Sequence, residues 1–80
     1  MDSTEKYRLM NVIWGTVIDY STKEPISKVC DAVCKRLNEE GYDPKIEGTN
    51  RGFRIVRVQD QRYKVLRNAG WGKYDLIMID

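Results

Sequence analysis

Residues 21–42 read STKEPISKVCDAVCKRLNEEGY, and this stretch encodes both the start and the end of a helix. Ser21 and Glu24 have the spacing of a capping box, in which two side chains satisfy the free backbone N–H groups of a first helical turn. Pro25 fits within that first turn, because its fixed φ angle is already helical. These signals predict a helix over residues 23–40.

The middle and the end of the same stretch agree with this prediction. Gly41 suits the left-handed position just beyond a helix, and Tyr42 can then pack back on the last turn. Between start and end, apolar residues recur at helical spacing and predict one buried face. This stripe consists of Ile26, Val29, Cys30, Val33 and Leu37.

Residues 4–20 also have a helical period, and Asp2 or Ser3 can cap their start. The composition argues against a helix here, because the segment is rich in β-branched residues and carries Gly15 in its middle. A strand over residues 11–20 is therefore the competing interpretation. The apolar face expected for the helix consists of Tyr7, Met10, Ile13, Trp14, Val17 and Ile18.

Beyond Pro44 the pattern changes to short strands separated by glycine-containing loops. The expected strands are residues 44–47, 53–58, 62–67 and 73–79. Residues 1–80 thus predict a single α+β domain with two layers, an N-terminal helical hairpin packed on an antiparallel sheet of three or four strands. A two-residue hairpin turn would place Arg57 opposite Arg62, so a three-residue turn that places Val58 opposite Arg62 is predicted instead.

Charge is distributed unevenly along the 80 residues, whose net charge is +2. Residues 1–44 contain six basic and eight acidic side chains, whereas residues 45–73 contain eight basic and two acidic ones. Such polarity bears on partners rather than on fold. There is no apolar run long enough to span a membrane and no signal-peptide pattern, which leads us to expect a cytoplasmic protein.

Few residues in the chain indicate chemistry. Histidine, the commonest general base and metal ligand, is absent from the sequence. Cys30 and Cys34 are interpreted as small core residues, because no histidine or further cysteine completes a zinc site. The run Gly70-Trp71-Gly72-Lys73 lacks the first glycine and the following Ser or Thr of a phosphate loop. We therefore predict no enzyme activity, no metal and no cofactor.

The basic strands are the best functional candidate. In the predicted register, one sheet face is left uncovered and displays aliphatic side chains, Val56 and Leu66 among them, between arginines and lysines. This predicts a small protein-interaction or regulatory module whose partner is another protein or a second copy; nucleic-acid binding through residues 51–73 is the alternative. A purely protective role of basic residues at sheet edges is also open. The predicted binding residues are Arg51, Arg54, Val56, Arg57, Arg62, Lys64, Leu66, Arg67, Trp71 and Lys73.

Overall fold

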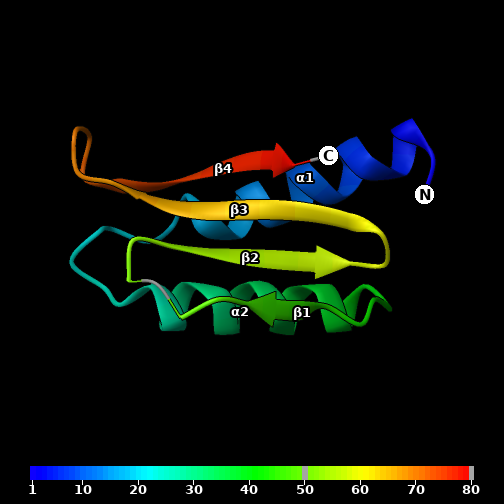
Figure 1. Ribbon diagram of the computed structural model, residues 1–80, viewed down its shortest axis with the longest axis horizontal. Helices are drawn as coiled ribbons and strands as arrows, with labels where there is room; N and C mark the ends of the chain where they lie inside the picture. The colour runs from blue at the N-terminus through cyan, green and yellow to red at the C-terminus, as the bar shows by residue number, and fades with distance from the viewer. Residues whose placement is uncertain (50, 80) are drawn as a thin grey trace.

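The computed structural model describes residues 1–49 and 51–79 and has two layers, with two helices packed on one face of a four-stranded sheet (Figure 1). The strands are antiparallel and follow the order β1-β2-β3-β4 across the sheet. The predicted two-layer α+β architecture is therefore confirmed. The elements are α1 (Ser3–Val17), α2 (Ile26–Glu39), β1 (Lys45–Glu47), β2 (Phe53–Val58), β3 (Gln61–Asn68) and β4 (Lys73–Ile79).

Residues 3–17 form a helix rather than a strand, and this helix begins with the expected Asp2 cap. The Asp2 side chain accepts a hydrogen bond of 2.9 Å from the backbone N–H of Glu5. The predicted apolar face is partly wrong, because Tyr7 is 61% exposed and Ile18, which follows the last helical residue, is 40% exposed. The buried row is Leu9, Ile13 and Val17, a run of every fourth residue that faces the sheet.

Helix α2 starts three residues later than predicted. Ser21 pairs with Lys73 at the start of β4, and the N–H of Thr22 donates to the carbonyl of Gly72 at 3.0 Å. This segment is thus held against the sheet, and Pro25 becomes an extended N-cap without a side-chain hydrogen bond. The capping-box prediction is wrong, because contacts with β4 outweigh a local signal.

The end of α2 and its buried face agree with the sequence. Gly41 has a φ angle of +89°, and the N–H of Tyr42 donates to the carbonyl of Leu37 at 2.9 Å, as in a Schellman motif. All five residues of the predicted stripe, Ile26, Val29, Cys30, Val33 and Leu37, are buried.

The hairpin between β2 and β3 has a two-residue turn, so the predicted three-residue register is wrong. Arg57 does lie opposite Arg62. Both side chains are exposed and Arg57 is 3.6 Å from a carboxylate oxygen of Glu47, so their repulsion is screened and small. Gln59, with a φ angle of +56°, supplies the backbone conformation that a tight turn requires. Burial of Val58 outweighs the residual repulsion.

This register decides which face of β2 meets the helices. Val56 and Val58 are at most 1% exposed and face the helices together with Tyr63 and Val65 of β3. The Tyr63 hydroxyl donates to the carbonyl of Lys6 at 2.7 Å and fixes α1 to the centre of the sheet. The two layers therefore share one core. The other sheet face is turned to the viewer in Figure 1, and no helix of the described residues covers it.

Candidate interaction surfaces

The sheet face that points away from the helices brings side chains of all four strands together on one surface. We name it the open face. Cross-strand pairing places the residues of each strand on it, because directly paired residues share a side. The open face consists of Lys45, Glu47, Phe53, Ile55, Arg57, Arg62, Lys64, Leu66, Asn68, Lys73, Asp75, Ile77 and Ile79.

Lys64 occupies the middle of the open face. It pairs with Ile55 on one side and with Ile77 on the other, and Leu66 follows on the same strand face. Its Nζ atom lies 4.4 Å from the centre of the Phe53 ring, a cation–π distance. Ile77 is 48% exposed. The centre of the open face is thus an apolar surface with one cation set into it.

The charges of the open face are unbalanced. It carries five cationic side chains and two carboxylates, which leaves three net positive charges. Glu47 is paired with Arg57, and Asp75 accepts a hydrogen bond of 2.5 Å from the Asn68 amide. Neither Arg62 nor Lys64 forms an ion pair with any residue that the structure describes. Arg62 and Lys64 are therefore available to a partner.

The predicted binding residues divide between several places. Five of them lie together on the open face, namely Arg57, Arg62, Lys64, Leu66 and Lys73. The expectation that Val56 lies there is wrong, since its side chain is fully buried in the core. Trp71 lies in the β3–β4 turn and stacks on Trp14, with ring centres 6.4 Å apart. The two-residue turn places Phe53 and Ile55, which alternate with Val56 along β2, on the open face instead.

The other predicted arginines lie away from the open face. Arg54 pairs with Val65, and Arg67 pairs with Tyr74, so both lie on the helix side of the sheet. With Arg51, they line a cavity of about 350 Å³ beside the first turn of α2, which we name the arginine pocket. The basic sequence of residues 51–73 therefore forms two surfaces rather than one.

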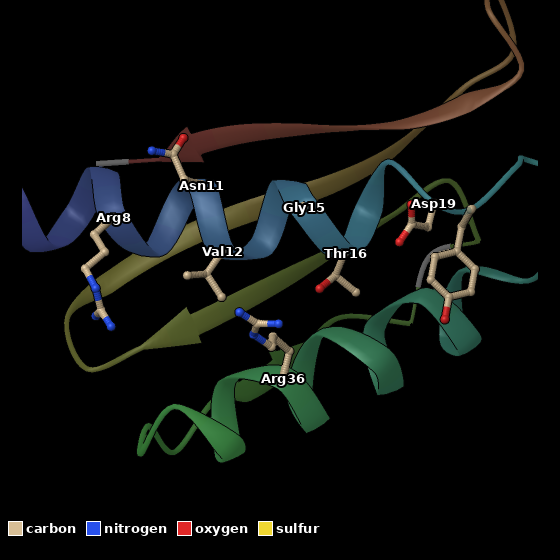
Figure 2. Close-up of a pocket in the computed structure, with 8 residues that line it drawn as sticks. Arg8, Asn11, Val12, Gly15, Thr16, Asp19 and Arg36 are labelled. Atoms are coloured by element: carbon tan, nitrogen blue, oxygen red, sulfur yellow. The ribbon is translucent and has the colours of Figure 1, made fainter.

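A groove of about 610 Å³ runs between α1 and α2 on the side that faces away from the sheet (Figure 2). Arg8 lies toward one end of this groove and Asp19 toward the other, while Arg36 of α2 lies near the middle, across from Val12 and Thr16 (Figure 2). Arg8 already donates to the Tyr42 hydroxyl at 2.8 Å. The groove thus has polar ends and is open to solvent between the two helices.

The two cysteines differ in how deeply they are buried. Cys30 is 2% exposed, and burial raises the pKa of its thiol to about 11. Cys34 is half-buried, and its thiol pKa is raised for the same reason. Within residues 1–49 and 51–79, no three metal-ligating side chains gather into one site, and neither helix has the length and apolar character of a membrane span.

The chain matches no protein-family model, no curated protein sequence and no solved structure. Any functional conclusion therefore depends on the surfaces described above.

Proposed function

We propose that this protein is a small non-enzymatic interaction module, and that its open face binds a protein surface with apolar side chains bordered by carboxylates. The observation that carries the proposal is the exposed Ile77 and neighbouring aliphatic side chains around Lys64, with three net positive charges on the same face. Apolar surface of this kind gains free energy when it is covered, and the charges favour an acidic partner.

The charge also decides between a foreign partner and a second copy. Two open faces brought together would each contribute three net positive charges, and like charges in an interface cost free energy. An acidic partner removes this cost and supplies counter-ions for Arg62 and Lys64. Self-association through the open face is therefore the weaker alternative.

Nucleic acid is a less suitable partner for this face. Sheets that bind single strands present aromatic rings on which bases stack. Here Tyr63 and Tyr74 are fully buried on the helix side, Trp71 stacks on Trp14, and the Phe53 ring lies beneath Lys64. The open face offers aliphatic side chains instead, which a phosphate backbone does not complement.

The test is a binding titration with defined probes. Binding is monitored through the backbone amide signals of β2, β3 and β4 in NMR spectra. The probes are an amphipathic peptide with glutamates beside its leucine face, the same peptide with lysines, and single-stranded and duplex oligonucleotides. We expect saturable binding of the glutamate peptide alone. Binding of the oligonucleotides without binding of the glutamate peptide would contradict the proposal and favour nucleic acid.

Matched variants locate the binding. The double reversal Arg62→Glu with Lys64→Glu should weaken binding of the glutamate peptide by about tenfold or more, because it replaces charge attraction by repulsion. The control Lys23→Glu with Lys35→Glu makes the same change in net charge at exposed positions outside the sheet and should have little effect. Equal losses in both double variants would mean that only net charge matters, and the open face would lose its role. Sedimentation of the free protein as a stable dimer that Ile77→Glu on the open face dissociates would favour self-association instead.

A further inference from the structure

The arginine pocket lies where the helix side of the sheet meets the first turn of α2. Its lining consists of Pro25, Ile26, Ser27, Arg51, Arg54 and Arg67. The three arginines come from three segments: the loop before β2, β2 itself and β3. We propose that this pocket binds a phosphate dianion, either free or as the phosphate group of a small molecule. The proposal is independent of the open face, because the two surfaces lie on opposite sides of the sheet.

Two of the three arginines, Arg54 and Arg67, are oriented by neutral groups. Arg67 donates to the carbonyl of Thr22, and its guanidinium lies 5.3 Å from the centre of the Tyr74 ring. Arg54 donates to the carbonyl of Phe53 at 3.3 Å. Each guanidinium has five N–H groups, so both keep several donors for a ligand. These contacts restrict the arginines without neutralising them.

No described carboxylate balances this charge. None of Arg51, Arg54 and Arg67 forms an ion pair with a described residue, and no described acidic residue lines the pocket. The acidic residue nearest in sequence, Glu24, accepts a hydrogen bond of 2.7 Å from Lys28 instead. Three like charges around one cavity repel each other, and an oxyanion relieves that repulsion while accepting paired hydrogen bonds from guanidinium groups.

The first turn of helix α2 adds backbone N–H donors to the pocket. Its N-cap is Pro25, which has no side-chain acceptor, and its first turn has no acidic residue. No described group accepts a hydrogen bond from the N–H of Ile26 or Ser27. The positive end of the helix dipole at this turn favours an anion, as do the arginines beside it.

The geometry favours a single phosphate group over a nucleic-acid strand. A strand requires cations along a continuous track, whereas the remaining cations of β2 and β3, Arg57, Arg62 and Lys64, lie on the other side of the sheet. A cavity of about 350 Å³ falls within the range of small-molecule sites, about 300–1,000 Å³. The pocket therefore has space for a phosphate group with a small moiety attached.

The experiment is an NMR titration of the protein with inorganic phosphate, adenosine monophosphate and glucose 6-phosphate, with chloride at equal ionic strength as the reference anion. We expect saturable shifts of the Ile26 and Ser27 amides and of the arginine side-chain signals with phosphate compounds only. Similar affinity for all three would identify phosphate itself as the ligand. Markedly tighter binding of one phosphate ester than of inorganic phosphate would identify a small phosphorylated molecule as the ligand. Shifts that chloride reproduces, or that do not saturate, would overturn the proposal.

Two variants and one control complete the test. Arg51→Gln and Arg54→Gln should each weaken phosphate binding by about tenfold, because each removes a charge-assisted contact. Arg51 is exposed, so Arg51→Gln tests the pocket even if the half-buried Arg54 contributes to folding. Arg62→Gln, on the open face, removes the same charge and should leave phosphate binding unchanged. If Arg62→Gln weakened phosphate binding as much as Arg51→Gln, only the net charge would matter, and the proposed site would be wrong.

Discussion

Replacing Tyr63 by phenylalanine should lower stability at neutral pH and leave it unaffected in alkali. The hydroxyl is fully buried and donates to the carbonyl of Lys6 at 2.7 Å, and its removal should cost about 1 kcal/mol at neutral pH. Burial, assisted by the nearby Tyr42 and Glu5, raises the pKa of Tyr63 to about 12. An unfolded tyrosine has a pKa of about 10. The protonated folded form therefore contributes stability below pH 10, and this contribution is lost as the pH rises toward 12.

At about pH 11 the wild-type protein should have lost about 1 kcal/mol through Tyr63, because the unfolded chain releases a proton that the folded chain keeps. The Tyr63→Phe variant has no such loss, so the two proteins should then have nearly equal free energies of unfolding. Urea unfolding followed by tryptophan fluorescence at about pH 8 and pH 11 measures both differences. Ionisation of Cys30 cancels, because both proteins contain it.

The matched control is Tyr7→Phe, since the Tyr7 side chain is 61% exposed. It should change the free energy of unfolding little at either pH. If the deficit of Tyr63→Phe had the same size at both pH values, the hydroxyl would not be buried and protonated in the folded protein. The position of α1 on the sheet would then need revision.

The remaining predictions concern backbone conformation, thiol reactivity and the two sides of the sheet. Gly41→Ala should cost about 1 kcal/mol because of its positive φ, whereas the exposed helical Gly15→Ala should be neutral or stabilising in the same urea assay. The Cys30 thiol, buried and with its pKa raised to about 11, should react with iodoacetamide slowly in the native protein and quickly in urea; fast native alkylation would contradict its burial. Val56→Glu should unfold the protein, while Ile77→Glu should leave its circular dichroism unchanged and weaken partner binding; a folded Val56→Glu variant would contradict the register of β2.

The features that the sequence predicted correctly are those determined within a few residues of the chain. The end of α2 depends on Gly41 and Tyr42, which are adjacent to the turn they close. Its buried stripe follows from spacing along one helix. The start of α2 depends instead on Lys73 and Tyr74, whose hydroxyl donates to the carbonyl of Glu24 at 2.6 Å. Those residues are about 50 positions away, so a local capping pattern could not reveal their effect.

The orientation of β2 was ambiguous for a different reason. Residues 53–58 read FRIVRV, so each side of the strand carries two apolar side chains and one arginine. Periodicity alone therefore favours neither side, and the length of the following turn makes the choice. Repulsion between Arg57 and Arg62 is too small to set the register, because both are exposed and Glu47 neutralises one of them.

The same alternation explains why a count of charge along the chain could not identify a partner. Arg54 and Arg57 are three residues apart and point to opposite sides of the sheet, as do Arg62 and Arg67 on the next strand. One basic sequence thus produces an open face with aliphatic side chains and a separate arginine pocket beside α2. Variants that reverse the whole basic segment would therefore remove two properties together. Only substitutions restricted to one side of the sheet, Arg62→Gln against Arg51→Gln, can assign a bound partner or anion to its surface.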